Sequence, residues 1–138
     1  MNYTEYVMMT DEEKRGLNPL FKLGNFVSHA GKELEWKIEA DALTDEDWEC
    51  LAKMIADRCS FGSVYGIPRG GVKLQKALEK YADPKSPFRL VVDDVYTTGK
   101  SMREEMKQGD IGFVVFARNK VDFDPERYVR ALFTMDAT

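Results

Sequence analysis

Two adjacent carboxylates, Asp93 and Asp94, directly follow the apolar run 90–92. Burying two like charges together is unfavourable because each raises the pKa of the other. We therefore expect both to face solvent or a ligand. Carboxylates accept hydrogen bonds strongly from hydroxyl groups, and a ribose cis-diol offers two of these. The pair is a candidate ribose site, and a plain strand end is the alternative.

A turn rich in hydroxyl groups comes next, before an expected helix over 101–108. Gly99 permits a tight turn, and the free amides at a helix N-terminus, together with nearby hydroxyls, form an anion site suited to a 5′-phosphate. A plain turn is the alternative, but order and spacing favour one ribose-phosphate site. A Walker A loop is excluded because it needs glycine at position 94. The candidate binding residues are Asp93, Asp94, Val95, Tyr96, Thr97, Thr98, Gly99, Lys100 and Ser101.

Strand-like and helix-like stretches alternate along the second half of the chain. Apolar runs predict strands over 63–67, 89–93, 111–117 and 128–135, with a helix over 72–81 between the first two. Such alternation predicts an α/β fold with a parallel sheet. Ligands of these sheets bind beyond the carboxyl ends of the strands. The candidate residues are therefore expected at that edge.

The first part of the chain reads as a small N-terminal lobe over 1–43, before a core over 44–138. A short helix is expected within 1–15, and alternating apolar residues predict a strand over 34–40. Thr44 and Asp47 form a capping box that starts a helix over 44–59. The two parts are expected to make one compact domain.

Composition excludes several classes of function. The length of 138 residues fits one domain, and the net charge of −4 argues against a nucleic-acid partner. No stretch approaches the roughly 20 apolar residues that cross a bilayer, and the N-terminus does not resemble a signal peptide. A cytoplasmic protein without a membrane partner is expected. Cys50 and Cys59 lack metal-ligand spacing, and we expect both to be reduced, half-buried helix residues.

The string LVVDDVYTTGKSM over 90–102 resembles the signature that binds 5-phosphoribosyl-1-pyrophosphate (PRPP) in type I phosphoribosyltransferases. The resemblance extends along most of the chain and is best toward orotate phosphoribosyltransferases. GNFVSHAGK over 24–32 is similar to a segment near the start of that family, and YGIPRGG over 65–71 is similar to its pyrophosphate loop. Arg118 stands where the family has a strand end with an arginine beside the base.

The resemblance implies a Rossmann-like type I phosphoribosyltransferase fold of reduced size, with an N-terminal hood. It implies transfer of a phosphoribosyl group from PRPP to a nitrogenous base, first an orotate-like pyrimidine, with Mg²⁺ as cofactor and a homodimer as assembly. Asp93 and Asp94 would be catalytic, hold the ribose and act indirectly on the metal, while Lys32 and Arg118 would face the base. The pyrophosphate loop, which often contains a non-proline cis peptide, would comprise Pro68, Arg69, Gly70 and Gly71.

One departure from the family bears on catalysis. Relatives have two further strands and a long basic loop before the PRPP motif, whereas here only ADPKSPF over 82–88 links the expected helix to the next strand. The family's loop closes over the reacting groups and excludes water. Its absence favours an alternative function, a non-catalytic sensor of PRPP or nucleotide. A lid, if there is one, is expected from residues 16–40.

Overall fold

A four-stranded parallel sheet forms the centre of the molecule, in the order β3-β4-β5-β6. The computed structural model describes residues 2–10, 13, 19–27, 31, 33–118 and 128–135. The predicted α/β class is confirmed, and each predicted strand of the core is present. The strands are β3 (Ser63–Gly66), β4 (Arg89–Tyr96), β5 (Ile111–Ala117) and β6 (Tyr128–Thr134).

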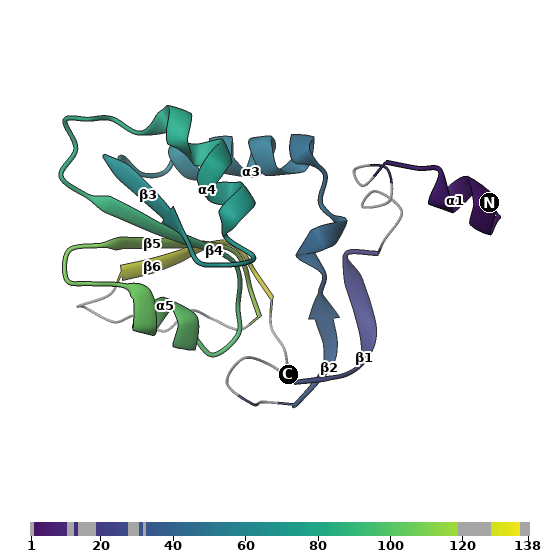
Figure 1. Cartoon of the computed structure of the whole chain (residues 1–138). Helices are drawn as coiled ribbons and strands as arrows, with labels where there is room; N and C mark the ends of the chain where they lie inside the picture. The colour runs from purple at the N-terminus through teal and green to yellow at the C-terminus, as the bar shows by residue number, and fades with distance from the viewer. Residues whose placement is uncertain are drawn as a thin grey trace.

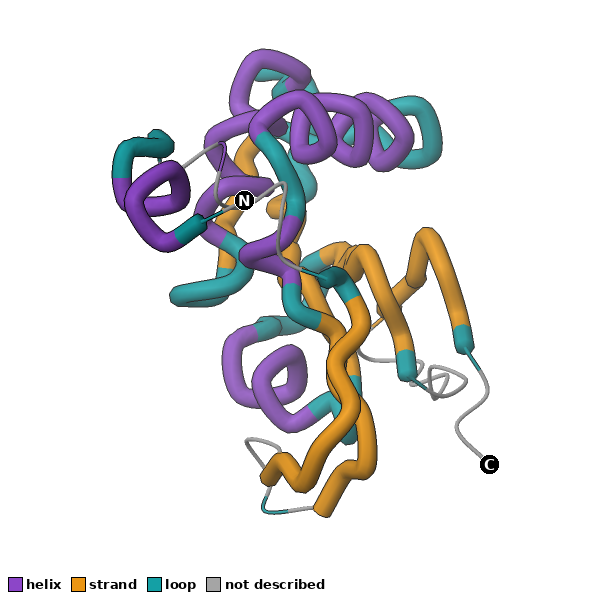
Figure 2. The backbone as a smooth tube through the Cα atoms, turned by 90° about the vertical axis from the view of Figure 1, so that its right-hand side faces the viewer, coloured by secondary structure: helices purple, strands orange, loops and turns teal. Residues whose placement is uncertain are grey.

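Helices cover both faces of this sheet (Figures 1 and 2). α3 (Asp45–Ala56) and α4 (Val72–Leu78) pack on one face, where a continuous apolar cluster includes Leu90 and Phe113. A single 3₁₀ turn, η2 (Glu79–Tyr81), continues α4. α5 (Lys100–Glu105) covers the opposite face with Met102. Three layers result, with the parallel sheet between the two layers of helices.

The predicted capping box starts α3. The Thr44 hydroxyl accepts a hydrogen bond from the Asp47 amide at 3.1 Å, and the Asp47 carboxylate accepts one from the Thr44 amide at 2.9 Å. The inward side of the helix buries Trp48 and Ile55. α3 ends at Ala56, so the expectation of two half-buried helical cysteines is only partly right. Both are free thiols, but Cys50 is exposed and Cys59 is half-buried beyond the helix end.

The N-terminal part contributes a short helix and a hairpin. α1 (Tyr3–Val7) lies within the expected range, and β2 (Glu33–Ile38) is the predicted strand. β2 pairs antiparallel with β1 (Phe21–Val27), a strand that the sequence did not predict. The hairpin continues through the 3₁₀ turn η1 (Ala40–Ala42) and stands beside the edge at which the parallel strands end (Figure 1). No helix in the described part is long and apolar enough to cross a membrane.

β4 is longer than the predicted strand, and it extends beyond the end of its neighbour β3. Its pairing with β3 ends at Val92, opposite Gly66, whereas its pairing with β5 continues to Tyr96. Residues 93–96 therefore have one side that none of the described strands covers. The loop after β3 reaches this side, because the Ile67 amide donates to the Val92 carbonyl at 2.9 Å.

The short connection over 82–88 lies at the opposite edge of the sheet. The Asp83 amide donates to the Phe61 carbonyl at 2.8 Å, and the Gly62 amide donates to the Phe88 carbonyl at 2.8 Å. Phe61 and Gly62 precede β3, so both bonds anchor the connection at the amino ends of the strands. The connection is therefore far from the edge at which Asp93 and Asp94 lie.

Candidate functional site

The predicted pyrophosphate loop is a tight turn between β3 and α4. The Gly71 amide donates to the Ile67 carbonyl at 2.8 Å, and the Val72 amide donates to the Arg69 carbonyl at 3.2 Å. The peptide bond between Pro68 and Arg69 is cis, as the family resemblance implied. Arg69 is exposed, so its guanidinium is available to a ligand at the end of the sheet.

Two glycines of this loop are required by close approaches to β4. A Cβ on Gly70 would overlap the carboxylate of Asp94, and a Cβ on Gly71 would lie 2.5 Å from the Val92 carbonyl oxygen. Real Cβ atoms do not tolerate such contacts, so only glycine lets the backbone lie against the strand. The loop and the Asp94 carboxylate are thereby held together.

The two predicted carboxylates lie on different sides of β4, since successive side chains of a strand alternate. Asp94 is half-buried and lines the pocket beside Arg69. Asp93 is 8% exposed and lines a hollow on the α5 side. The expectation that both carboxylates avoid burial is therefore wrong for Asp93. They also do not immediately follow the strand, because β4 continues to Tyr96.

Burial is the main reason why Asp93 titrates abnormally. Burial, together with the neighbouring carboxyl of Asp94, raises the pKa of Asp93 to about 8. The Asp94 amide donates to Asp93 Oδ1 at 2.8 Å, which partly offsets the rise. Near neutral pH this carboxyl is therefore substantially protonated, and a protonated carboxyl can donate as well as accept a hydrogen bond.

The turn after β4 has the conformation that the sequence predicted. Gly99 is left-handed, with φ +82°, and caps α5 without a side-chain hydrogen bond. A Cβ at this position would overlap the Tyr96 hydroxyl. The predicted phosphate-binding residues surround one small hollow of about 20 Å³, which is lined by Asp93, Val95, Tyr96, Thr97, Thr98, Gly99, Lys100, Ser101 and Met102.

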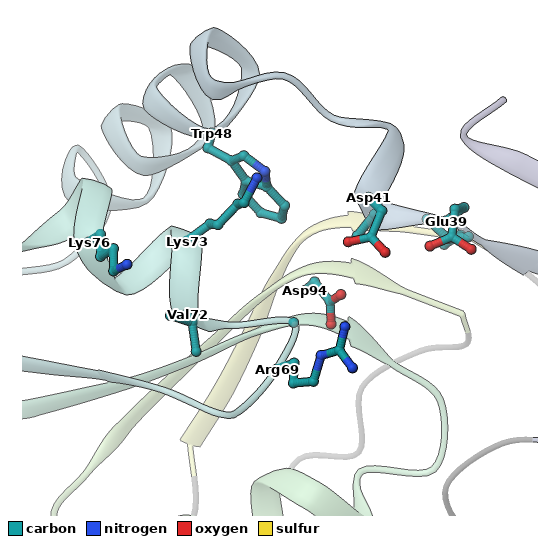
Figure 3. A pocket seen from close by; sticks show the side chains of 11 residues that line it. Glu39, Asp41, Trp48, Arg69, Val72, Lys73, Lys76 and Asp94 are labelled. Atoms are coloured by element: carbon teal, nitrogen blue, oxygen red, sulfur yellow. The ribbon is translucent and has the colours of Figure 1, made fainter. Parts of the chain in front are cut away.

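A larger pocket of about 600 Å³ lies between the hairpin side and the core (Figure 3). Arg69, Gly70 and Asp94 form its floor, at the end of the sheet. Its other walls were not predicted from the sequence, because they come from segments distant in the chain. They comprise Ile38 at the end of β2, then Glu39, Ala40 and Asp41 after the hairpin, Trp48 of α3, and Val72, Lys73 and Lys76 of α4.

Charge is divided across this pocket. Glu39 and Asp41 come from the segment after β2, whereas Lys73 and Lys76 project from α4. The lysines follow Arg69 by four and seven residues, a helical spacing that could have suggested a shared face. Lys73 lies 3.8 Å from Asp45, and both side chains are well exposed, so this ion pair is weak.

Arg118 is placed at the end of β5 but points to the hairpin. It is 7% exposed, its Nη1 donates to the Trp36 carbonyl, and its guanidinium carbon lies 3.7 Å from the centre of the Trp36 ring. The residue thus joins the hairpin to the core and does not line the pocket. The other predicted base contact, Lys32, lies outside the described residues.

The side chains at the site determine whether a metal ion could bind there. Among the described residues no group of three or more acidic, histidine or cysteine side chains could hold one. Mg²⁺ is commonly bound by one or two carboxylates together with substrate phosphates and water. Asp94, exposed to the pocket beside the pyrophosphate loop, fits that mode of binding, in which the substrate supplies most of the ligands.

Comparisons with known proteins identify the fold. No protein-family model and no curated protein matches the chain. Orotate phosphoribosyltransferase from Aeropyrum pernix matches with a TM-score of 0.62 and 18% identity, over 90% of this chain and 92% of that chain. The enzyme from Francisella tularensis matches with a TM-score of 0.54 and 16% identity, over 88% and 84% of the chains. Leishmania donovani UMP synthase matches with a TM-score of 0.62 and 14% identity, over 83% of this chain and 33% of that one. The chain therefore has the type I phosphoribosyltransferase fold.

Proposed function

We propose that this protein binds PRPP and transfers its phosphoribosyl group to a nitrogenous base, with release of pyrophosphate. The observation that carries the proposal is the position of Asp93 and Asp94 between two different anion-binding loops. The hydroxyl-rich turn lies on one side of the pair and the glycine-rich loop on the other. A ribose that carries phosphate groups at both ends needs this arrangement.

The substrate is assigned to the site by chemistry. The 5′-phosphate accepts hydrogen bonds from the amides and hydroxyls of the turn at Thr97–Ser101. The pyrophosphate lies against the loop at Arg69, where Lys73 and Lys76 add positive charge. Asp94 is assigned to the ribose from the pocket side of β4. Asp93 is assigned to the ribose from the opposite side of the same strand. The base then occupies the remainder of the large pocket. The resemblance by itself favours an orotate-like pyrimidine, whereas the side chains of the pocket bear on the class of base separately.

The reaction is a displacement at the anomeric carbon of the ribose. A ring nitrogen forms a bond to that carbon with its lone pair, the bond from carbon to the pyrophosphate oxygen breaks with its electron pair, and the nitrogen loses its proton to solvent. Positive charge develops on the ribose during this step. A nearby carboxylate such as Asp94 stabilises that charge because it is already oriented, by its hydrogen bond from the Val95 amide at 2.8 Å.

We propose Mg²⁺ as the cofactor, bound with the pyrophosphate and held on the protein side by Asp94. When bound, it would neutralise the charge of the leaving group. Arg69, Lys73 and Lys76 contribute to the same end from the protein, since their charges line the wall nearest the pyrophosphate loop.

A second candidate, a sensor that binds PRPP without turnover, is favoured by one observation. The connection over 82–88 is fixed at the amino ends of the strands by its bonds to Phe61 and Gly62. Fully extended, it would span at most roughly 25 Å, so it does not reach across the sheet to cover the site. Water then competes with the base for the ribose, and slow transfer or hydrolysis is expected.

Calorimetric titration with PRPP and Mg²⁺ tests binding, and product analysis with a panel of bases tests turnover. Asp94→Asn should weaken PRPP binding by about tenfold or more, because a charge-assisted hydrogen bond is lost. Asp83→Asn, in the connection at the far edge, is the matched control and should bind normally. Equal affinity of the wild type and Asp94→Asn would contradict the ribose assignment. Binding without transfer to any base would identify the sensor.

A further inference from the structure

We infer that the base accepted by this site presents hydrogen-bond donors, such as an exocyclic amino group or a protonated ring nitrogen, to the residues after β2. It does not present a carboxylate there, as orotate would. The inference rests on the proposed function and names the class of acceptor within it. It is based on the placement of acidic and basic side chains on different walls of the large pocket.

The wall available to the base is acidic. Glu39 and Asp41 line it, and both come from the segment that follows the hairpin (Figure 3). Glu39 is held in place by Lys37 at 3.2 Å and by Lys22 at 3.7 Å. Asp41 is exposed and is not seen to form an ion pair or side-chain hydrogen bond with any described residue. An ionised carboxylate only accepts hydrogen bonds, so this wall is suited to donors.

The cations of the pocket are on the other wall. Arg69, Lys73 and Lys76 extend from the pyrophosphate loop along α4. In a complex with PRPP they lie next to the diphosphate and are occupied by it. A carboxylate on the base would then face Asp41, which has no ion pair with a described residue, and Glu39, with which Lys22 and Lys37 are already paired. Juxtaposed like charges select strongly against such a partner.

Of the two cations that the family resemblance assigned to the base, Lys32 lies outside the described residues and Arg118 is used elsewhere. Arg118 is buried, stacks on Trp36 and donates to its carbonyl oxygen. It is absent from the residues that line the large pocket. Its charge is therefore directed at the hairpin and not at a ligand. This is an independent reason to exclude a carboxylated base from the preferred class.

The remaining walls suit a flat, largely apolar ring. Ile38, Trp48 and Val72 contribute apolar surface between the acidic and basic walls. An aminopyrimidine or aminopurine places its ring against this surface and its amino group toward the carboxylates. Small-molecule pockets commonly combine such apolar walls with a few polar groups that determine specificity.

The test uses the full chain loaded with PRPP and Mg²⁺ and measures binding of adenine, cytosine and orotate by titration. At least one amino-bearing base should bind about tenfold more tightly than orotate or better. Asp41→Asn should weaken binding of that base, and Asp41→Lys should reverse the preference so that orotate binds more tightly. Glu35→Lys makes the same charge change at an exposed site of β2 outside this pocket, and should retain the wild-type preference.

The outcomes separate this inference from the proposed function. If PRPP itself does not bind, the proposed function fails. If PRPP binds and orotate is preferred, or if all three bases bind equally or not at all, the acceptor inference is overturned while PRPP binding stands. An Asp41→Lys variant that keeps the wild-type preference would also overturn it, because the selecting charge would then lie elsewhere.

Discussion

At the scale of single residues, Asp93 combines a poor environment for stability with a position in the candidate site. A carboxyl that is largely buried and adjacent to another carboxyl is unfavourable when it is ionised. Perturbed titration of this kind is concentrated at functional sites. Here the perturbed group lies on the strand between the two loops that we propose to bind the phosphate groups.

The pKa of Asp93 predicts a specific dependence of stability on pH. Because folding raises this pKa from its ordinary value near 4 to about 8, the unfolded chain releases its proton first as pH rises. The stability associated with the protonated form is therefore lost between about pH 4 and pH 8. Asp93→Asn should remove this loss and stabilise the protein at pH 8 by about 1–3 kcal/mol, with little change at pH 4. Urea unfolding of the wild type and the variant at both pH values measures this difference in stability.

Asp41→Asn is the control, since it removes an exposed carboxylate and should leave the dependence on pH unchanged. The same Asp93→Asn protein should bind PRPP less tightly. Loss of stability at pH 8 in Asp93→Asn would contradict the proposed cost of burying this charge. A gain in stability with a loss of binding is the expected pattern for a residue retained for function.

The sequence predicted the local conformation of the candidate residues where they are contiguous in the chain. The strand, the turn and the glycine loop each depend on local chemistry, such as the left-handed position of Gly99. The burial of Asp93 was not predicted, because it depends on how far β4 continues beside β5. Arg118 was found by position in the sequence, but its contact with Trp36 depends on the hairpin, and a local pattern does not show it.

At the scale of elements, the turn between β4 and α5 depends on one glycine in a left-handed conformation. Gly99→Ala adds a strained backbone conformation and an overlap with the Tyr96 hydroxyl. It should lower stability by about 1–3 kcal/mol and weaken ribose 5-phosphate binding, because the amides of the turn move. Denaturant unfolding and calorimetric titration measure the two effects.

Gly109 offers a matched control for this prediction. It is also left-handed, with φ +89°, but a Cβ there would meet nothing within 4 Å. Gly109→Ala should therefore lose stability through backbone strain alone and keep normal phosphate affinity. If both variants bind ribose 5-phosphate like the wild type, the turn is not the phosphate site.

Elements with strong local signals were predicted most accurately. α3 was found through the capping box of Thr44 and Asp47, and β5 through its uninterrupted apolar run. β1 was missed because its side chains are mostly exposed, Gly24 interrupts it, and its pairing with β2 has a register shift. Its stability as a strand comes from pairing with β2, which the sequence of β1 alone does not encode.

At the scale of the whole molecule, the buried side chain of Arg118 helps to connect the hairpin to the end of the sheet. Arg118→Ala removes both the stacking on Trp36 and the hydrogen bond to its carbonyl. The hairpin and the acidic segment after it should then be held less firmly. Binding of the base should weaken by about threefold to tenfold, while ribose 5-phosphate binds as before. Titration of the two ligands separately measures this.

Arg130, on the edge strand β6, makes the same two kinds of contact with residues outside the hairpin. Its guanidinium lies 5.2 Å from the Phe113 ring centre, and its Nη1 donates to the Arg58 carbonyl at 3.0 Å. Arg130→Ala should lower stability to a similar extent without a selective effect on the base. An equal loss of base binding in both variants would show that general destabilisation, and not placement of the hairpin, is responsible.

The positions of the two tryptophans give the protein a built-in optical readout. The chain has only Trp36 and Trp48. The first indole lies directly beneath the Arg118 guanidinium, and the second, 5% exposed, forms part of the wall of the large pocket. Emission from Trp36 therefore follows the contact between hairpin and core, while emission from Trp48 follows occupancy of the pocket. With one of the two replaced by phenylalanine, stopped-flow fluorescence would time each event separately and give the order in which ligand entry and hairpin movement occur.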